Sequence, residues 1–279
     1  MRRMMTLLAA SLLFIAVAQA GEPKHDYFTT SDGVKIHYMT LGKKGSWVVL
    51  IHGYTDTAER MWFKTGIAQA LAVNHRVVAL DNRNHGLSDK PQPGGAGRAE
   101  DIVELMDHLK IEKAHIHGYS MGGGITARLM ASNPERFLTA TLGGSGIAEN
   151  DDKLRASATA LDPPMPEPQG EEAAAFRELR NSSELRRARN AASGNAKTPR
   201  PTLDIDLKKI AFPVLAINGE YDRPYSKTHR LWRELNNFQN VVIPKKNHVS
   251  AIMVGGPMPP EYIDALVKFI DANDIPDAH

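Results

Sequence analysis

Short apolar runs alternate with segments of helical periodicity along most of the chain. Trp47–Ile51 is apolar throughout, and Arg76–Leu80 is apolar after its first residue. Unbroken apolar runs of this length are typical of strands that are buried on both faces, as in a parallel sheet. Residues 98–109 differ, because their apolar positions recur at helical spacing. The alternation predicts an α/β fold with a mostly parallel sheet and helices on both faces.

The expected strands and helices follow one another in the order of an α/β domain. A hairpin turn at Ser31-Asp32-Gly33 joins the first two strands, which fits an antiparallel pair at a sheet edge. Strands are expected at residues 25–30, 34–41, 47–51, 76–80, 138–142, 213–218 and 240–243 and in the apolar run from Ala114, and helices at 57–71, 98–109, 121–132, 225–236 and 261–272.

The alternation stops between Ala148 and Asp206. Residues 162–168 contain four prolines, which exclude a helix or a central strand there. Residues 171–192 are rich in alanine and charge and are expected to be helical. We interpret residues 148–206 as a cap insertion that lies over one end of the sheet. It would separate a first core part, residues 21–147, from a second core part, residues 207–279.

The first twenty residues are expected to form a secretory signal peptide. Arg2 and Arg3 precede an apolar run at residues 7–17, and the small residues 18–20 provide a cleavage site before Gly21. The run is short for a membrane span, although an uncleaved N-terminal anchor stays open as an alternative. The chain has no cysteine, so no disulfide and no lipid attachment at the cleavage site is expected. We therefore expect a periplasmic or secreted protein, with no membrane contact after cleavage.

The charge balance disfavours strongly charged partners. The formal net charge is +2, from 34 Lys+Arg and 32 Asp+Glu. Removal of Arg2 and Arg3 with the signal peptide leaves 32 of each sign. A chain that is about neutral is not expected to bind nucleic acid or an anionic lipid surface.

A glycine-flanked serine lies where the apolar run from Ala114 passes into an expected helix. The segment Gly118-Tyr119-Ser120-Met121-Gly122 has the Gly-x-Ser-x-Gly spacing of a sharp strand-to-helix turn, which exposes the serine hydroxyl. Close packing at such a turn favours glycine at positions 118 and 122. The N–H groups of the following helix favour negative charge near the serine. A turn that needs glycine only for flexibility is the alternative.

Two later loops supply the partners that a serine nucleophile needs. Such a serine requires a base and a third group that orients the base. In an open α/β sheet, these groups lie in loops at the carboxyl ends of strands. Asp222 and His248 each follow an expected strand within a few residues. Other acids lie in the second half of the chain, but none follows a strand end as closely, among them Asp204, Asp206 and Glu149.

These features together resemble the α/β-hydrolase fold superfamily, in its small serine esterase-like branch with a short cap insertion. The resemblance is carried by His52-Gly53, by the Asp81-x-Arg83-x-x-Gly86-x-Ser88 segment, by the turn at Ser120, and by the loops of Asp222 and His248 in the order Ser, Asp, His. Asn84 departs from the glycine that is usual in the second segment. The resemblance implies a sheet of about eight strands with helices on both faces and a small cap.

The resemblance also implies a role for each matching residue. Ser120 would be the nucleophile, His248 the general base and later the acid, and Asp222 the group that orients His248. The backbone N–H groups of Tyr54 and Met121 would form the oxyanion hole. Histidines elsewhere are expected to be structural, namely His52, His85 and His117.

The expected reaction is hydrolysis of small or moderately apolar carboxylic esters through an acyl-enzyme. A serine at position 120, in place of an aspartate, disfavours epoxide opening and halide displacement. Lactones, thioesters, lipids, amides and carbon–carbon bonds stay open as substrates of the same residues, and a ligand-binding protein without turnover is a second class. Activity should fall at acid pH with a midpoint of about 6 to 7, because a histidine base is protonated there.

The substrate pocket and any bound cofactor are less well defined by the sequence. Several aromatic and methionine side chains are pocket candidates, and for each of them ordinary packing is the alternative: Tyr54, Trp62, Met121, Met165, Tyr225 and Met253. No local spacing of histidines and acids resembles a metal site, so neither a metal nor another cofactor is expected. The expected partner is a small-molecule ester.

Overall fold

The structure is a computed structural model. It describes residues 21–91, 98–167, 169–170, 173–174, 177, 181, 203–252 and 258–274. The expected signal peptide at residues 1–20, most of the expected helix at residues 171–192 and the pocket candidate Met253 lie outside the described residues.

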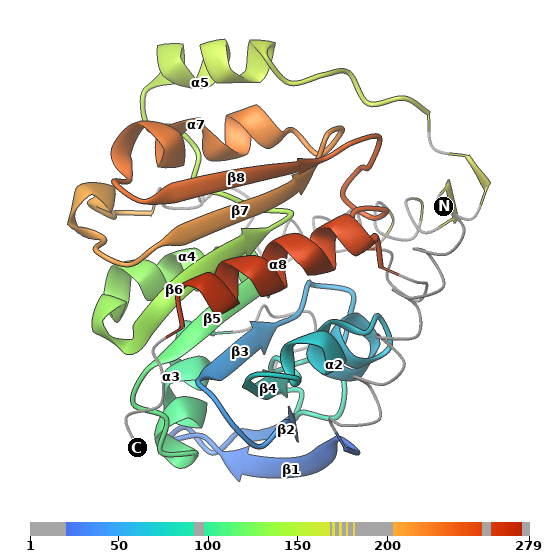
Figure 1. Cartoon of the computed structure of the whole chain (residues 1–279), viewed down its shortest axis with the longest axis vertical. Coiled ribbons are helices and arrows are strands. Elements are labelled where there is room, and N and C mark those ends of the chain that lie inside the picture. The colour runs from blue at the N-terminus through green and yellow to red at the C-terminus, as the bar shows by residue number, and fades with distance from the viewer. Residues whose placement is uncertain are drawn as a thin grey trace, which may run out of the picture.

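The described strands form a single eight-stranded sheet in the order β1-β2-β4-β3-β5-β6-β7-β8 (Figure 1). β1 and β2 pair antiparallel at one edge, β2 pairs antiparallel with β4, and the remaining pairs are parallel. The predicted fold class is therefore confirmed. The strands are β1 (Lys24–Thr29), β2 (Lys35–Leu41), β3 (Trp47–Ile51), β4 (Arg76–Leu80), β5 (Ala114–Tyr119), β6 (Phe137–Gly143), β7 (Val214–Gly219) and β8 (Phe238–Ile243).

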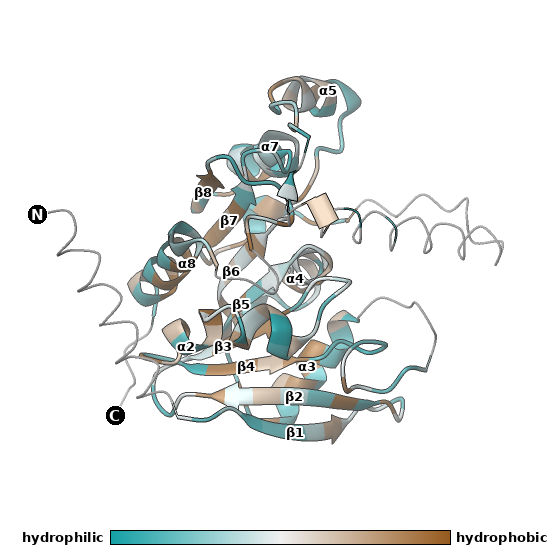
Figure 2. Ribbon diagram, turned by 90° about the vertical axis from the view of Figure 1, so that its right-hand side faces the viewer, coloured by the Kyte–Doolittle hydropathy of each residue, from teal (hydrophilic) through white to brown (hydrophobic). Residues whose placement is uncertain are grey.

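Helices cover both faces of the sheet, as Figure 2 shows edge-on. Apolar side chains of α3, α4 and α7 form one core with the sheet, and those of η1, α2 and α8 form a second core on the other face. Val49 and Ile51 of β3 enter the first core and Val48 and Leu50 the second, because neighbouring residues of a strand point to opposite faces. The helical segments are η1 (Glu59–Phe63), α2 (Ile67–Leu71), α3 (Ala99–His108), α4 (Met121–Ser132), η2 (Pro134–Arg136), α5 (Asp152–Ala160), η3 (Leu207–Lys209), α7 (Pro224–Glu234) and α8 (Pro260–Ala272).

One expected helix is broken in two, and one helix was not predicted. The helix expected at residues 57–71 consists of η1 and α2, because Gly66 lies between them in the left-handed conformation with φ +89°. α5 was not predicted, since its sequence has few apolar residues to mark a periodicity. Its start is fixed instead by the carboxylate of Asp151, which accepts hydrogen bonds from the N–H groups of Lys153 and Leu154.

The beginning of the predicted insertion is attached to α7. α5 packs beside α7 near the β8 edge of the sheet, and the chain then runs toward the side where the strands end (Figure 1). Asp162 Oδ1 accepts hydrogen bonds from the N–H groups of Tyr225 and Ser226 at 2.8 and 3.2 Å, which caps the first turn of α7. The predicted insertion boundaries at residues 148 and 206 stay predictions.

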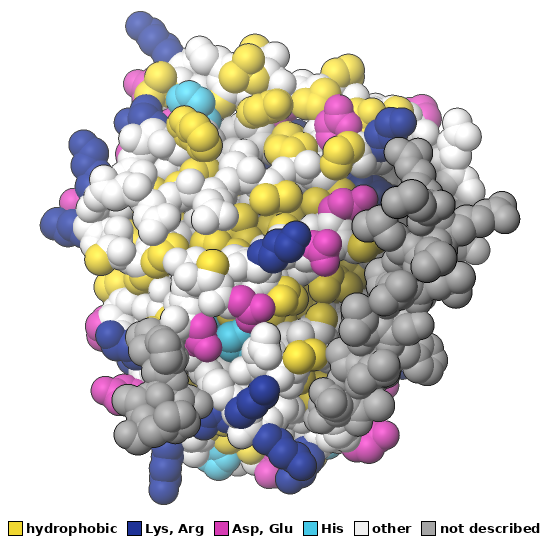
Figure 3. Space-filling model, viewed as in Figure 1, with side chains coloured by type: hydrophobic (Ala, Val, Ile, Leu, Met, Phe, Trp, Pro, Cys, Tyr) yellow, Lys and Arg dark blue, Asp and Glu magenta, His cyan; other side chains and the backbone are white. Residues whose placement is uncertain are grey.

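The surface combines charges of both signs with apolar side chains. Figure 3 shows acidic and basic side chains interspersed over the face that carries α8 and α2. Of the helices in the described part of the chain, none has both the length and the apolar character that crossing a bilayer requires.

Candidate active site

Ser120 occupies a strained turn between β5 and α4. Its backbone has φ +55° and ψ −108°, a conformation that residues other than glycine rarely adopt. Such a conformation costs on the order of 1–3 kcal/mol and persists only when the surrounding structure holds it. The N–H of Ser120 donates to the carbonyl of Gly143 on the neighbouring β6 at 2.8 Å. The turn raises the Ser120 side chain at the carboxyl end of the central strand.

The glycines beside Ser120 are required by close backbone contacts. A Cβ atom on Gly118 would overlap the carbonyl of Gly122, and a Cβ atom on Gly122 would overlap the carbonyl of Ile51 at the end of β3. Gly124, in the same helix, has open space where its Cβ would be. The structure therefore agrees with the prediction that close packing requires glycine at positions 118 and 122. Gly124 is a matched control for a substitution at Gly122.

Gly122→Ala is expected to destabilise the protein strongly, because α4 must move away from β3 to make room for the methyl group. The loss should reach roughly 3 kcal/mol or more, as for other severe overpacking. Gly124→Ala should be neutral or stabilising by up to about 1 kcal/mol, since alanine favours a helix over glycine. Urea unfolding of both variants measures the difference. Equal stabilities would show that the contact at Gly122 is easily relieved.

His248 connects Ser120 to Asp222. His248 Nδ1 lies 2.8 Å from Asp222 Oδ2, and Nε2 lies 2.9 Å from Ser120 Oγ. A carboxylate only accepts hydrogen bonds, so Nδ1 carries the proton and donates to Asp222. In the neutral ring, Nε2 is then an acceptor for the Ser120 hydroxyl. This arrangement allows the ring to remove the proton of Ser120.

Lys227 in α7 is a neighbour of Asp222 that the sequence did not reveal. Its Nζ donates to Asp222 Oδ1 at 2.5 Å and to the carbonyl of Gly144 at 3.1 Å. Burial raises the pKa of Asp222, but the charges and hydrogen bonds of His248 and Lys227 outweigh it and lower the pKa overall. Burial also lowers the pKa of Lys227, against the opposing effect of Asp222. Each oxygen of Asp222 thus has its own cationic or N–H partner.

The loop that carries His248 is held by Tyr119 and by its own turn. The Tyr119 hydroxyl donates to the carbonyl of His248 at 2.7 Å, and the two rings lie 5.4 Å apart. The side chain of Asn247 accepts hydrogen bonds from the N–H groups of Val249 and Ser250 at 2.9 and 3.0 Å. The sequence did not predict this role of Tyr119, because only its place next to Ser120 distinguished it.

The His52-Gly53 segment lies directly against Ser120. A Cβ atom on Gly53 would stand 3.5 Å from Ser120 Cβ. The N–H of Asn82 donates to His52 Nε2 at 2.9 Å, so His52 Nδ1 carries the proton and donates to the carbonyl of Gly53 at 2.7 Å. Burial lowers the pKa of His52 to about 4, which keeps the ring neutral. His52 therefore fixes the backbone that leads to Tyr54, whose N–H is one of the two expected oxyanion donors.

Asp81 fixes the loop beyond β4 and ties it to η1. Its carboxylate accepts from His37 Nδ1 at 2.9 Å, from the N–H of Ala58 at 2.8 Å and from the N–H of Leu87 at 2.9 Å. A Cβ atom on Gly86 would overlap this carboxylate. These contacts explain the aspartate and the glycine of the Asp81 to Ser88 segment.

The other positions of this segment also have structural reasons. Arg83 binds Asp101 of α3 at 2.6 and 2.8 Å and Asp32 of the first hairpin at 2.9 Å. Asn84, the departure from the usual glycine, has φ +69°. Asparagine tolerates this left-handed conformation better than most residues, so the substitution keeps the turn.

Asp81→Asn is expected to lower the free energy of unfolding by roughly 2 kcal/mol at pH 7. Burial raises the pKa of Asp81, but hydrogen bonds from His37, Leu87 and Ala58 outweigh it and lower the pKa to about 2. A carboxyl with a lowered pKa stabilises the fold above its unfolded value of 3.8 and loses this effect as the pH falls toward 2. Urea unfolding between pH 7 and pH 3 should therefore show a smaller pH dependence in the variant.

The control is Asp107→Asn, at an exposed carboxylate that pairs only with Arg136 among the described residues. Its effect should stay within about 0.5 kcal/mol. An Asp81 variant as stable as this control at pH 7 would contradict the stabilising role of Asp81.

The pocket candidates lie in different environments. Trp62 does not line an open site, because its side chain is fully buried in the core of η1 and α2 and contacts the His117 ring edge-on at 5.1 Å. Met165 and Tyr225 are 44% and 43% exposed, which leaves both accessible to a ligand. Met121 and Tyr54 are half-buried.

The histidines outside the Ser120 site have structural contacts. His117 Nδ1 donates to the carbonyl of Thr141 at 3.2 Å and Nε2 accepts from the Tyr262 hydroxyl at 3.1 Å. Burial lowers the pKa of His117 to about 4. His85 Nδ1 lies 3.0 Å from the carbonyl of Arg83 and thus braces its own loop.

Comparisons with known proteins agree with the fold. Residues 46–166 match the family described as alpha/beta hydrolase fold. The dihydrolipoyllysine-residue acetyltransferase component of the acetoin cleaving system of Cupriavidus necator is 35% identical over 117 residues, which are 41% of this chain and 30% of that protein. Esterase YbfF of Escherichia coli is 33% identical over 91 residues, 32% of this chain and 35% of the esterase. The chain thus spans about a third of the length of these curated relatives.

A solved structure extends the likeness over nearly the whole chain. The 2-hydroxy-6-oxo-6-phenylhexa-2,4-dienoate hydrolase from a Rhodococcus species is 26% identical, with a TM-score of 0.63 over 90% of this chain and 98% of that one. The sheet order and the family match together identify the α/β-hydrolase fold. Over residues 46–166 the chain is similar to the α/β-hydrolase fold family, and the solved structure extends the shared fold over 90% of the chain.

Proposed function

We propose that the protein is a serine hydrolase that cleaves carboxylic esters through an acyl-enzyme. The observation that carries the proposal is the continuous hydrogen-bonded series from Asp222 through His248 to Ser120, with 2.8 and 2.9 Å between the joined atoms. These distances and the tautomer of His248 are those that nucleophilic catalysis by serine needs. The strained backbone of Ser120 supports it, because strain of this kind gathers at functional sites.

The reaction follows from these positions. Ser120 Oγ forms a bond to the ester carbonyl carbon while its proton passes to His248 Nε2. The carbonyl oxygen becomes negative and accepts hydrogen bonds from the backbone N–H groups of Met121 and Tyr54. The bond to the alcohol oxygen then breaks, and His248 returns the proton to the leaving alcohol. A water molecule, deprotonated by the same ring, releases the acid and restores Ser120.

Small or moderately apolar esters are the proposed substrates. Met165 and Tyr225 are accessible apolar side chains on the insertion and on α7. The part of the insertion that the structure describes has no large apolar face of the kind a lipid substrate needs, since α5 is mostly exposed and polar. Residues 1–20 have the composition of a signal peptide. The proposed place of action is therefore the periplasm or the medium.

Other substrates of the same three residues are the competing proposals. A lactone, a thioester, a peptide or a carbon–carbon bond next to a carbonyl could also be attacked by Ser120. The similarity to a dienoate hydrolase over 98% of its length makes such dienoates a specific second candidate. A ligand-binding protein without turnover is a third, of another class.

The test is a substrate panel with the mature protein. p-Nitrophenyl esters from acetate to decanoate should be hydrolysed, fastest at short or medium chain length, and the rate should fall at acid pH because a protonated histidine cannot act as a base. Faster turnover of a lactone, a thioester, a peptide or 2-hydroxy-6-oxo-6-phenylhexa-2,4-dienoate would replace ester hydrolysis by that reaction. A protein that turns over none of them and whose Ser120 a fluorophosphonate does not label would be a binding protein.

A further inference from the structure

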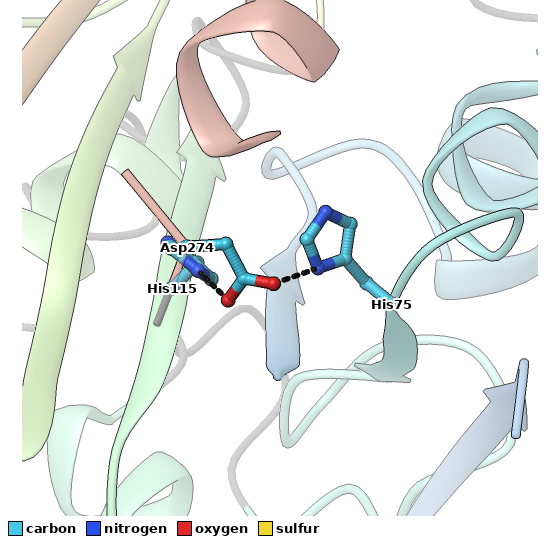
Figure 4. A group of neighbouring side chains, drawn as sticks. All are labelled: His75, His115 and Asp274. Atoms are coloured by element: carbon cyan, nitrogen blue, oxygen red, sulfur yellow. Dashed lines mark hydrogen bonds and ion pairs between the residues drawn. The ribbon is translucent and has the colours of Figure 1, made fainter. Parts of the chain in front are cut away.

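Two histidines and an aspartate meet at the end of the sheet opposite Ser120. His75 lies just before β4, His115 is at the start of β5, and Asp274 follows α8. Figure 4 shows the Asp274 carboxylate between the two imidazole rings. Both histidines are buried, and one ring nitrogen of each and a carboxylate oxygen of Asp274 lie within 4.8 Å of one another. The cluster takes no part in the reaction proposed for Ser120.

One nitrogen of His75 is left facing a negative charge. His75 Nε2 lies 2.8 Å from the carboxylate of Asp271, so Nε2 carries a proton and donates it. In the neutral ring, Nδ1 then has a free lone pair. Nδ1 is buried, has no hydrogen-bond partner, and lies 3.7 Å from Asp274 Oδ2. Two groups that only accept hydrogen bonds therefore face each other in a buried place, which is unfavourable without a cation between them.

His115 differs from His75, because its Nε2 faces the Asp274 carboxylate, which only accepts hydrogen bonds, so without an ion this nitrogen carries the proton. Its Nδ1 lies 2.8 Å from the hydroxyl oxygen of Thr139, and its Nε2 lies 3.3 Å from Asp274 Oδ1. Metal-binding histidines usually donate their second ring nitrogen to an oxygen acceptor, which fixes the ring and the tautomer. Asp271 supplies this acceptor for His75. The Thr139 hydroxyl, which both donates and accepts, takes a hydrogen bond from His115 Nδ1 when Nε2 releases its proton to bind an ion. Asp274 is itself held by the hydroxyl of Ser46.

We propose that His75 Nδ1, His115 Nε2 and the Asp274 carboxylate bind a Zn²⁺ ion. Two imidazoles and one carboxylate are a ligand set that suits Zn²⁺, with a water molecule in the fourth position. Bonds of about 2.0–2.2 Å in a tetrahedron separate neighbouring ligand atoms by roughly 3.3–3.6 Å. His115 Nε2 lies 3.3 Å from Asp274 Oδ1 and His75 Nδ1 lies 3.7 Å from Asp274 Oδ2, so the two nitrogens face different oxygens of one carboxylate. One atom of each of the three groups lies within 4.8 Å of the others, so small side-chain shifts bring them to this spacing.

The ion would join the chain after α8 to the beginnings of two central strands. Its ligands come from three segments that are far apart in the sequence, so the ion is a cross-link of the folded state. It lies at the amino ends of β4 and β5, whereas Ser120 follows the carboxyl end of β5. The expected role is therefore structural. Saturating Zn²⁺ should raise the thermal midpoint by roughly 5–10 °C and leave ester turnover unchanged.

The test uses the mature protein without an affinity tag, stripped with a chelator and titrated with ZnCl₂ by calorimetry. One ion per chain is expected, confirmed by elemental analysis after dialysis. His115→Gln and Asp274→Asn should each weaken binding at least tenfold, and Asp271→Asn should weaken it roughly 10- to 100-fold through His75. His108→Gln, at an exposed histidine of α3, should bind as the unchanged protein does.

Three results would overturn the proposal. The first is that the stripped protein takes up no Zn²⁺. The second is that the ligand variants bind Zn²⁺ as tightly as His108→Gln does. The third result is a second proton on His75, seen by NMR of the imidazole nitrogens in the presence of Zn²⁺, which would mean that an imidazolium between Asp271 and Asp274 satisfies the cluster. If a variant does not fold, the test is the thermal midpoint of the unchanged protein, measured with and without Zn²⁺, because this measurement needs no substitution.

Discussion

Ser120→Ala is expected to lower kcat for a p-nitrophenyl ester by roughly 10⁴-fold or more. The loss is this large because Ser120 Oγ is the atom within 2.9 Å of His248 Nε2, and alanine leaves the base nothing to activate. Steady-state kinetics of the two proteins measures it. Ser132→Ala, at the other end of α4, is the matched control and should keep full activity.

The stability of the Ser120 variants separates chemistry from folding. Alanine inherits the φ of +55°, so Ser120→Ala should unfold at nearly the same urea concentration as the unchanged protein. Ser120→Gly relieves the strained conformation and should be more stable by about 1 kcal/mol or more, while being equally inactive. A Ser120→Ala protein that keeps more than a tenth of the turnover would rule out an acyl-enzyme at this residue.

Asp222→Asn is expected to lower kcat by roughly 10⁴-fold as well. An asparagine amide can donate to His248 Nδ1, which favours the tautomer with the proton on Nε2, and such a ring cannot accept the proton of Ser120. The same substitution removes the carboxylate partner of Lys227, which is 18% exposed. Loss of one partner of a largely buried pair costs about 3–5 kcal/mol at most, so this variant should also be less stable.

A second substitution distinguishes the two effects of Asp222. In the double variant Asp222→Asn with Lys227→Met, no unpaired ammonium remains, so much of the lost stability should return. Turnover should stay as low as in Asp222→Asn, because the tautomer of His248 is still wrong. Urea unfolding and steady-state kinetics on the four proteins of this cycle measure both quantities. Recovery of turnover in the double variant would mean that the unpaired lysine, and not the tautomer, caused the loss.

The sheet could be predicted from the sequence because its central strands are short, unbroken apolar runs, which are typical of buried parallel strands. The expected strand at residues 47–51 matches β3, and the expected strand at 76–80 matches β4. The break at Gly66 was missed, because one glycine in a helical pattern does not say whether its φ will be positive. α5 was missed since a polar, exposed helix has no apolar stripe to mark it.

The residues proposed for catalysis could be selected because parallel strands bring their carboxyl ends to one edge. This rule points to Ser120, Asp222 and His248 from strand ends alone. Lys227 could not be found in this way, since its contact with Asp222 depends on how α7 is oriented after the turn. The cluster of His75, His115 and Asp274 could not be predicted for a similar reason. No local spacing in the sequence connects the starts of two strands with a residue that follows the last described helix.

α7 makes a mechanical connection between the insertion and the charge beside the active site. Asp162 of the insertion accepts hydrogen bonds from the N–H groups of Tyr225 and Ser226, and the next residue of the same turn, Lys227, is bound by Asp222. Because both attachments lie in the first turn of α7, that turn moves as one unit. Displacement of the insertion by an incoming ligand would therefore be transmitted to the position of the Lys227 ammonium, and the electrostatic environment of Asp222 would depend on what the insertion contacts.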